Sequence, residues 1–488
     1  MASVPRTGRR AVGKRRRLRS KQRRAWLKAR ARAARRKLET AERMMPRATR
    51  SLLDTLAAVF THPTYLRVVV LLVAAILTTG RHTVLNVLRT AGALAPGAAS
   101  SYHRVFSRRR WKPLELARGL TGWVVRCCVP IGRVRLVGDD TVDEHPGRKV
   151  FGKGKHRDPV RSSHSYTAFR WGHKWVVLAV LVRFPFAVRP WALPILAVLY
   201  RARDKDAQGK RRHKTPADWM RQMRRLVLRW FPDRQFVFGG DGSYGTHDLA
   251  VTASRSHGRL AVVSRFYGNA ALYDPPRTQK RRGRRRICGA RRAKPETVVT
   301  ETKSRRRLTV SWYGGGRREV SVASGTGHWY QSGAGLAPVL WVHVRDCTGT
   351  HRDEYFFTTD LAMELAELIE TYTARWSIEV TFQEMRSYVG LETTRGRSER
   401  TVLRVAPSLF GLYTIVACWY AQLPVRQRRE HGVQWIGKSD VTFSDAITAV
   451  RRWLWQEWIF VIPGHSRVFQ KIRRPFRAVL LYALAPAA

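Results

Sequence analysis

The chain has 488 residues, of which 44% are hydrophobic, and its 92 Lys and Arg outnumber 34 Asp and Glu to give a formal net charge of +58. This length exceeds one ordinary core and predicts two or three domains, and the hydrophobic content, with 17 Trp, excludes a largely disordered chain. A net charge of this size is tolerated only with a polyanionic partner or strong counterion screening. Double-stranded DNA fits best, because each neutralised phosphate releases counterions.

The cysteine positions and the apolar segments exclude several other classes of protein. Cysteines occur at 127, 128, 288, 347 and 418, an odd number without zinc-site spacing, which disfavours a zinc module and a secreted disulfide framework. The longest apolar run, from Val68 to Leu77, is 10 residues, whereas a membrane span needs about 20. No apolar signal core follows the basic N-terminus closely. We therefore expect a cytoplasmic protein without a membrane partner.

The first 125 residues favour helices that contact DNA. Residues 1–50 are strongly basic, and Arg23 to Arg36 has helix-forming composition, so we expect a basic arm that becomes helical on DNA; a solvated tail is the alternative. Residues 51–125 predict a helical DNA-binding domain, in which Ser51 caps one helix and Thr83 another. Arg81 lies in the break between two of these helices and is a candidate DNA contact.

Residues 126–265 predict the first part of an α/β core. Strands are expected at Arg133 to Val137, His173 to Val182 and Trp191 to Leu199, followed by a helix at about 216–230 and a strand at Phe236 to Phe238. Strands and a helix in this order, with acids at the strand ends, predict a sheet whose site lies at one edge.

The rest of the chain divides into an insertion, a returning core and a C-terminal region. Residues 266–358 predict a β-rich insertion, whose basic loop contains Arg284 and Arg285 and is expected to contact phosphate. Residues 359–425 predict the second part of the core, which begins with a helix capped by Asp360. Residues 426–488 predict a basic, helical C-terminal region.

Three carboxylates stand where a metal-dependent nuclease would need them. Asp139 and Asp241 each follow a short apolar run, and Glu379 lies far downstream. Two Asp and one Glu can hold two divalent metal ions side by side, and such a pair polarises a phosphodiester and activates its attacker. Asp140 also directly precedes Thr141, so it remains an alternative to Asp139 at the first position.

Helical spacing separates Glu379 from its neighbour Glu384. If residues 372–386 form one unbroken helix, then at about 100° per residue Glu379 shares a face with Tyr372, Arg375 and Arg386. Glu384 falls about 120° from Tyr372, off that face. Arginines beside a metal-bound carboxylate suit DNA phosphates, because Arg grips phosphate with a bidentate fork. A surface row of ion pairs is the alternative.

At these residues the chain resembles the DDE transposases of bacterial insertion sequences, and more narrowly the group whose third motif is Tyr-x2-Arg-x3-Glu-x6-Lys. Tyr372, Arg375 and Glu379 match that motif, and Arg386 stands where the group has Lys. The charge is kept at that position, although the geometry of the side chain changes.

The first and second motifs of such enzymes also have counterparts in the chain. Asp139 with Thr141 resembles the first motif, and the segment Asp241-Gly-Ser-Tyr244-Gly245 resembles the second. The likeness covers roughly residues 60–425. It selects Asp139, Asp241 and Glu379 as catalytic metal ligands.

The resemblance implies an RNase H-like mixed sheet flanked by helices, with a β-strand insertion before the glutamate helix. It implies two Mg²⁺ ions, for which Mn²⁺ can substitute, and cut-and-paste transposition: hydrolysis at the terminal inverted repeats of a mobile element, then strand transfer into target DNA. The implied assembly is a homodimer in a synaptic complex, in a bacterial cytoplasm and associated with the nucleoid.

The resemblance also implies DNA contacts by Tyr372, Arg375 and Arg386, and a hairpin intermediate whose flipped base is held by an aromatic of the insertion. Trp312 and Trp329 are candidates for that aromatic by location, because base stacking is the physics required. Either could equally be a core residue of the insertion.

Two other functions remain open from the sequence. A repurposed transposase that binds DNA without cutting it would keep these folds, although the presence of all three acids argues against it. Another nuclease of the same fold, such as a junction resolvase, would cut without strand transfer. The long segment between Asp241 and Glu379 makes that alternative less favoured.

Overall fold

The computed structural model describes residues 7–158, 162, 165–203, 206, 212–276, 286–433, 435–438, 440–459 and 466–487. The chain divides into two compact units. The first comprises Met1–Trp111 with Arg451–Ala485, and the second comprises Lys112–Val450 with Pro486–Ala488. Each unit is therefore built around its own set of contacts.

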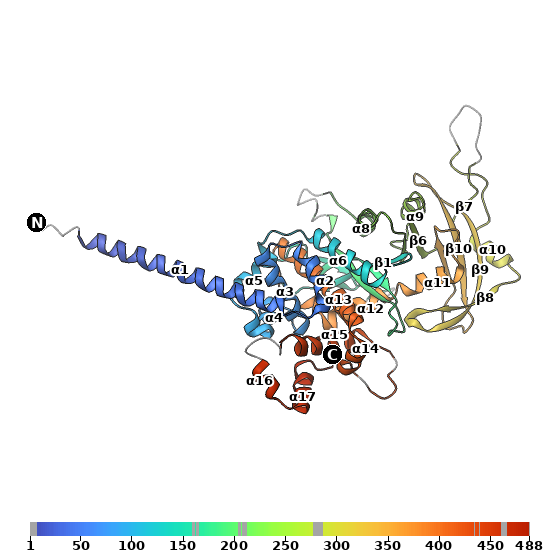
Figure 1. Cartoon of the computed structure of the whole chain (residues 1–488). Helices are drawn as coiled ribbons and strands as arrows, with labels where there is room; N and C mark the ends of the chain where they lie inside the picture. Colours follow the sequence, from blue (N-terminus) through green and yellow to red (C-terminus); the bar gives the residue numbers. More distant parts are fainter. Residues whose placement is uncertain are drawn as a thin grey trace, which may run out of the picture. The chain divides into compact units, whose positions relative to one another are not determined.

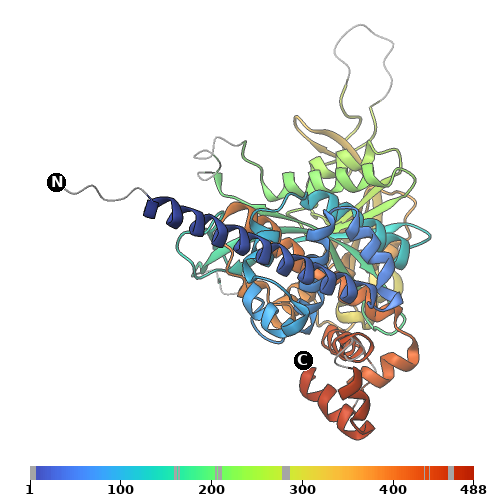
Figure 2. The same cartoon turned by 60° about the vertical axis from the view of Figure 1, so that its left-hand side comes forward.

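The first unit is helical. Its long basic helix, drawn in blue in Figures 1 and 2, is α1 (Thr7–Arg43). It is followed by α2 (Arg50–Ala57), α3 (His62–Leu77), α4 (Val84–Ala91) and α5 (Ala99–Ser107), and the C-terminal segment adds the end of α15 (Phe443–Glu457), α16 (Ser466–Lys471) and α17 (Arg474–Leu484). Buried Arg451 joins its parts, because its Nε donates to the Ile76 carbonyl at 2.7 Å.

One of the two predicted helix caps in this unit is confirmed. Thr83 caps α4, since its Oγ1 accepts a hydrogen bond from the Asn86 amide at 3.2 Å. The prediction for Ser51 was wrong: α2 already begins at Arg50, and Thr49 occupies the cap position, where its side chain accepts no hydrogen bond from the helix amides. The preceding 3-10 turn, Arg47–Thr49, leads directly into α2 and leaves no extended residue at Ser51.

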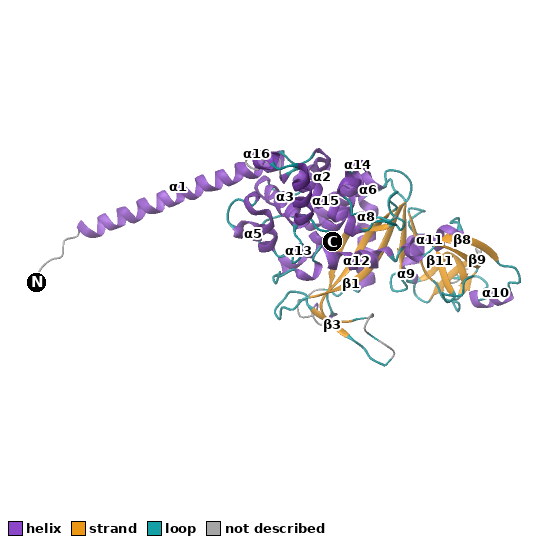
Figure 3. Cartoon of the chain, turned by 90° about the horizontal axis from the view of Figure 1, so that it is seen from below, coloured by secondary structure: helices purple, strands orange, loops and turns teal. Residues whose placement is uncertain are grey.

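The second unit contains one 11-stranded mixed sheet flanked by helices, as expected for the fold class (strands are orange in Figure 3). The strand order is β2-β3-β1-β5-β6-β11-β10-β9-β7, with β4 paired to β3 and β8 paired to β9. The strands of the first half are β1 (Val134–Glu144), β2 (Gly154–Arg157), β3 (Phe169–Val182), β4 (Trp191–Tyr200), β5 (Phe236–Gly240) and β6 (Leu260–Arg265). Of these, β1, β5 and β6 run parallel, whereas β3 is antiparallel to β1 and to β4.

The predicted β-rich insertion extends this same sheet. It contains β7 (Leu272–Tyr273), α10 (Pro295–Glu301), β8 (Arg306–Ser311), β9 (Arg317–Gln331), β10 (Gly335–Asp346) and β11 (Glu354–Thr358). Because β11 pairs antiparallel with β6, the insertion is continuous with the first half of the sheet. The division of the chain into six segments stays a prediction.

Helices cover both faces of the sheet beside β1. On one face lies α8 (Pro216–Trp230), and Gly138 permits its approach, because a Cβ there would lie 2.4 Å from the Met220 Cε. On the other face, α12 (Ser377–Tyr388) packs against β1 and β4, and α13 (Glu399–Gln422) packs against β4. The remaining helices of this unit are α6 (Pro113–Cys128), α9 (His247–Ser254), α11 (Leu365–Ala374) and α14 (Val425–His431).

The helix α13 is apolar and long enough to cross a membrane by length and composition alone. Within the part of the chain that the structure describes, it is the single helix that passes this test. However, 72% of its apolar window is buried inside the protein. Burial of this extent is typical of the core helix of a folded protein.

Two predicted boundaries near the site differ from the structure. The strand that ends at Val137 in the prediction continues as β1 to Glu144, because its far end pairs with β3 through Glu144 and Gly172. Asp360 does not cap a helix: its Oδ1 accepts a hydrogen bond from the Ala362 amide in a turn, and α11 begins only at Leu365. Asp360 instead forms an ion pair with Arg133 at 2.8 Å.

Candidate active site

Asp139 and Asp241 lie side by side on adjacent parallel strands. Residues Gly138 of β1 and Gly240 of β5 are partners in the strand register, and each is followed directly by one of the two acids. Neighbouring strands are about 4.8 Å apart, so the two carboxylates emerge close together. The sequence prediction that these acids meet at one place in the sheet therefore agrees with the register.

The turn after β5 fixes the Asp241 carboxylate. Its Oδ1 accepts hydrogen bonds from the amides of Ser243 and Tyr244, at 3.0 and 3.2 Å. The backbone turn is tight, because a Cβ on Gly245 would lie 1.9 Å from the Ser264 Oγ. Glycine at this position lets the turn pack against β6 and holds Asp241 at the end of its strand.

The third acid, Glu379, lies in the first turn of α12. The hydrogen-bonded helix breaks at Arg375 and Trp376, between α11 and α12, so the assumption of one unbroken helix was wrong. The backbone at both residues nevertheless stays in the right-handed helical region, with φ/ψ of −52°/−35° and −54°/−22°. Helical spacing therefore holds across the break, and Arg375 still reaches Glu379.

Arg375 connects the first and third acids. Its Nη1 lies 3.0 Å from the Asp139 Oδ2, and its Nη2 lies 3.1 Å from the Glu379 Oε1. The Arg375 and Asp139 side chains are only 11% and 17% exposed, whereas Glu379 is 46% exposed. The guanidinium thus holds two carboxylates from distant parts of the sequence beside one another, and Glu379 stays open to solvent.

Asp140 points away from this group. Its two carboxylate oxygens are occupied, by the Tyr244 hydroxyl at 2.7 Å and by the Lys174 Nζ at 2.9 Å. Successive side chains of a strand alternate between faces, so Asp139 shares the α12 face while Asp140 shares the opposite face with Gly138. Lys174 was not singled out from the sequence, because its approach to Asp140 depends on the strand register, in which Lys174 pairs with Val142, rather than on any local motif.

Burial and neighbouring charge raise the pKa of Asp139 to about 7. Desolvation is the main cause, Arg375 acts against it, and the nearby carboxylates of Asp241 and Asp140 add to the rise. The Arg375 charge therefore does not fully offset the combined effect of burial and the nearby carboxylates on the pKa of Asp139. A further cation beside these oxygens would favour the ionised carboxylate.

Glu384 serves a structural network away from the three acids, as the helical spacing predicted. Its Oε1 lies 2.8 Å from the Arg189 Nη2, and its Oε2 accepts a hydrogen bond from the Tyr413 hydroxyl at 2.6 Å. Burial raises its pKa, which Arg189 and Tyr413 partly oppose. Glu384 thus links α12 to α13 and to the segment before β4.

The predicted DNA contacts of the third motif make protein contacts in this structure. The Tyr372 ring is 5% exposed and stacks on Phe356 with centroids 4.2 Å apart. Arg386 donates from Nη2 to the Thr141 hydroxyl and to the Val142 carbonyl, and its Nε pairs with Glu392 at 3.2 Å. Arg386 therefore ties α12 to β1, and a DNA contact by either residue stays a prediction.

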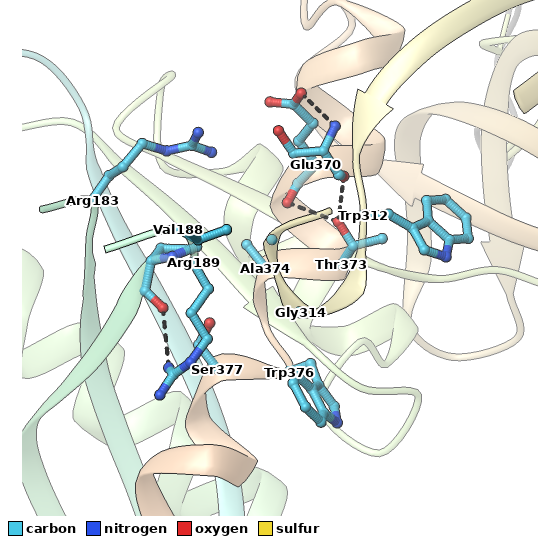
Figure 4. Close-up of a pocket in the computed structure, with 13 residues that line it drawn as sticks. Arg183, Val188, Arg189, Trp312, Gly314, Glu370, Thr373, Ala374, Trp376 and Ser377 are labelled. Carbon is cyan, nitrogen blue, oxygen red and sulfur yellow. Dashed lines mark hydrogen bonds between the residues drawn. The ribbon is translucent and has the colours of Figure 1, made fainter. Parts of the chain in front are cut away.

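Trp312 lies in the core of the insertion, beside a pocket of about 350 Å³ that is open to solvent. Its side chain is 7% exposed, and Figure 4 shows the indole directed away from the other labelled side chains of the pocket. By contrast, Trp376 at the helix break is 38% exposed and also lines this pocket. Base stacking by Trp312 stays a prediction, for which its indole would have to leave the core.

The other predicted DNA contacts are spread over the chain. Trp329 is half-buried in an aromatic group, with its ring 4.9 Å from His247 and 5.3 Å from Phe266 between centroids. Arg81 is exposed in the turn before α4 in the first unit. Arg284 and Arg285 lie outside the described residues. The structure therefore brings together the three acids and Arg375, and a DNA contact by Trp329 or Arg81 stays a prediction.

Comparison with known families decides the class of protein. The family model of DDE superfamily endonucleases matches residues 55–319, more than half of the chain. The chain belongs to the DDE superfamily endonucleases. A second family model, described as archaeal putative transposase ISC1217, matches residues 289–401, a range that includes Glu379.

Two further comparisons complete these findings. This DDE superfamily endonuclease is similar to a piggyBac transposase solved by cryo-electron microscopy as a synaptic complex with hairpin DNA, with 9% identity and a TM-score of 0.39. That similarity covers 87% of this chain and 77% of the other. No curated protein sequence matches the chain.

Nucleases of the DDE superfamily generally use divalent metal ions, and the acids of this chain fit such ions chemically. Across the described residues, no three or more His, Cys, Asp or Glu side chains are already arranged to hold a metal. Arg375 stands between Asp139 and Glu379, where it compensates part of their charge. Carboxylate oxygens are the ligands that Mg²⁺ prefers, and a bound cation would oppose the rise in the pKa of Asp139 that burial and the nearby carboxylates cause.

Proposed function

We propose that this endonuclease is a DNA transposase. It would hydrolyse phosphodiesters at the ends of a mobile element and then transfer the freed strand into target DNA. The single observation that carries the proposal is the register Gly138–Gly240, which sets Asp139 and Asp241 side by side on parallel strands, facing the helix of Glu379. The archaeal transposase family model across Glu379 supports the transposase class over other nucleases.

In this proposal Asp139, Asp241 and Glu379 hold two Mg²⁺ ions, which can be replaced by Mn²⁺. When bound, such ions polarise the phosphodiester and lower the pKa of the attacking group. The exposed carboxylate of Glu379 faces solvent, from which DNA approaches, whereas Asp139 is buried. The mixed sheet, with an antiparallel β3–β4 hairpin beside parallel β1, β5 and β6, supports an RNase H-like core.

The protein's own contribution is to position these carboxylates and to control their charge. Arg375 keeps Asp139 and Glu379 oriented before substrate arrives, and its fork can exchange a carboxylate for a DNA phosphate. The amides of Ser243 and Tyr244 orient Asp241. The bonds of Asp140 to Tyr244 and Lys174 occupy its carboxylate, and this supports Asp139 as the residue at the first position.

The partner is double-stranded DNA, attracted by the net charge of +58. We further propose that a homodimer acts in the cell, because two element ends must be cut and joined together, and that the protein works in a bacterial cytoplasm at the nucleoid. An aromatic of the insertion would hold a flipped base if cleavage passes through a hairpin.

An excision assay tests the function. A plasmid that carries a marker between the DNA segments that flank the gene is incubated with the purified protein and Mg²⁺ or Mn²⁺. Transposition predicts excised marker and its joining to a target plasmid. Binding to the ends without any nicking would support the repurposed, inactive protein instead. Cutting without joining would favour a nuclease of the resolvase type.

A further inference from the structure

The β2–β3 hairpin exposes two aromatic rings opposite two cations. In the strand register Lys155 pairs with Trp171, and Arg157 pairs with Phe169. Residues directly opposite in an antiparallel pair point to the same face, so all four side chains share one face. The rings of Trp171 and Phe169 are 60% and 50% exposed, and both cations are exposed. We call these four residues the β2–β3 patch.

Lysine ammonium groups lie near both rings of the patch. The Lys155 Nζ lies 4.2 Å from the Phe169 ring centroid, and the Lys153 Nζ lies 5.9 Å from that of Trp171. Neither Lys155 nor Arg157 forms an ion pair with an acid of the described residues. The patch therefore offers both apolar ring faces and unpaired positive charge to solvent.

The opposite face of the same hairpin is arranged differently. There Arg170 pairs with Glu144 at 3.1 Å and with Asp158 at 2.9 Å. His156 on that face is buried. The hairpin thus neutralises and covers one face while it leaves the other charged and apolar. This contrast indicates that the patch is a binding surface rather than a general excess of basic residues.

We propose that the β2–β3 patch binds unpaired bases of a DNA strand, with Trp171 and Phe169 stacking on bases while Lys155 and Arg157 contact phosphates. This inference rests on the proposed function in so far as it takes DNA as the substrate. Aromatic rings interleaved with cations are the general means of holding single strands, because every base has a face on which a ring can stack. Stacked bases of an intact duplex do not offer those faces.

The position of the patch relates it to the proposed site. Val177 of β3 is the strand partner of Asp139, and Trp171 lies six residues before Val177 on the same strand. At about 3.3 Å per residue, the ring lies ~20 Å along the sheet from that acid, which is about six steps of stacked DNA. Alternation along β3 and pairing with β1 place Trp171 and Asp139 on the same face. A strand cut at the acids would therefore be held about six nucleotides away.

The test measures binding of the full-length protein to a single-stranded oligonucleotide that contains 2-aminopurine, and to a duplex of the same sequence. W171A and F169A should each weaken single-strand binding about tenfold and reduce the quenching of 2-aminopurine, with little effect on the duplex. W171F should retain most of the affinity, because it keeps a ring. K155Q/R157Q should weaken binding and lower its salt dependence.

Trp435 provides a matched control. It is also an exposed tryptophan, at 61%, with Lys438 Nζ 3.8 Å from its ring centroid, but it lies outside the hairpin. W435A should leave single-strand binding unchanged. The inference is overturned if W171A and F169A bind the single strand as the wild type does, or if they weaken duplex binding by the same factor.

The two proposals fail separately. If the wild-type protein excises DNA but W171A binds the single strand as tightly as the wild type does, the stacking role alone is contradicted. If the wild-type protein never cuts DNA, the proposed function is contradicted. The stacking role still holds in that case if W171A and F169A lose single-strand affinity and W435A does not.

Discussion

The Arg375 guanidinium lies 3.0 Å from the Asp139 carboxylate and joins two elements separated by more than 200 residues of sequence. Through its second nitrogen it also holds Glu379 at 3.1 Å. The charge of this one side chain therefore stabilises the acidic group in the protein before any ion or DNA binds. Its removal is the first test.

R375A should destabilise the protein and disturb the site together. Asp139 would stay buried without its cation, and the loss of one partner of a buried pair costs about 3 kcal/mol in the free energy of unfolding. Chemical unfolding measures this loss. A divalent ion bound beside Asp139 replaces part of the missing positive charge. Adding roughly 10 mM Mg²⁺ should therefore raise the free energy of unfolding of R375A by more than it raises that of the wild type. Equal gains would show that no ion binds near Asp139.

E379Q and E384Q, on the same helix, should have opposite effects. Glu379 is 46% exposed, so E379Q should change stability by less than about 0.5 kcal/mol and lower the cleavage rate roughly a thousandfold. Glu384 is buried between Arg189 and Tyr413, so E384Q should lower the melting temperature and leave the cleavage rate of the folded protein within a few-fold of wild type.

Thermal unfolding, together with cleavage kinetics measured below the lower of the two melting temperatures, separates the two glutamates. A normal cleavage rate in E379Q would remove Glu379 from the proposed site. Loss of cleavage in well-folded E384Q would assign the chemistry to the other glutamate.

The titration of Asp139 predicts how metal binding depends on pH. Its pKa in the folded protein is about 7, so protons compete with the ion for this carboxylate, and Mn²⁺ affinity should fall as the pH is lowered from 8 to 6. D139N should remove most of this dependence as well as most of the affinity. Calorimetric titration with Mn²⁺ measures both. A wild-type affinity that is constant across this range would contradict the raised pKa.

The same group has a defined effect on stability. The folded-state pKa lies above the unfolded value of about 3.8, so the native state binds more protons between pH 4 and 7. The contribution of Asp139 to the free energy of unfolding therefore falls as the pH rises through that window. Asp143, whose pKa burial raises to about 8, acts in the same direction, so the difference between wild type and D139N isolates Asp139.

Two glycines of the turn after β5 should respond differently to alanine. A Cβ on Gly245 would lie 1.9 Å from the Ser264 Oγ, so G245A must displace the turn that orients Asp241, at a cost of about 2 kcal/mol in stability. A Cβ on Gly242 meets nothing within 4 Å, which makes G242A the matched control. Cleavage should fall in G245A and be retained in G242A. Equal activity of the two variants would show that the turn does not position Asp241.

Local patterns predicted most of the elements around the site. The helix expected at about 216–230 is α8 (Pro216–Trp230), because apolar spacing and the Thr215 capping box act within the segment itself. The strand before Asp241 was also predicted, since its apolar run ends in a glycine turn. Helical spacing correctly separated Glu379 from Glu384, because φ and ψ stay helical across the break at Arg375.

The remaining features depend on contacts between distant segments. The preference for Asp139 over Asp140 follows from which face of β1 meets Arg375 and which meets Lys174, and neither partner is close in sequence. The extension of β1 to Glu144 requires its pairing with β3. The exposed rings of the β2–β3 patch were missed because their spacing alone resembles that of a buried strand.

The most direct test of the central claim compares D139N with D140N in Mn²⁺-dependent cleavage of a plasmid that contains the DNA flanking the gene. We expect that D139N binds this DNA as wild type does but does not cut it, and that D140N, which keeps the Arg375 pair, still cuts. Cleavage by D139N at the wild-type rate would contradict the assignment of Asp139 as a metal ligand, and so would loss of cleavage in a folded D140N alone.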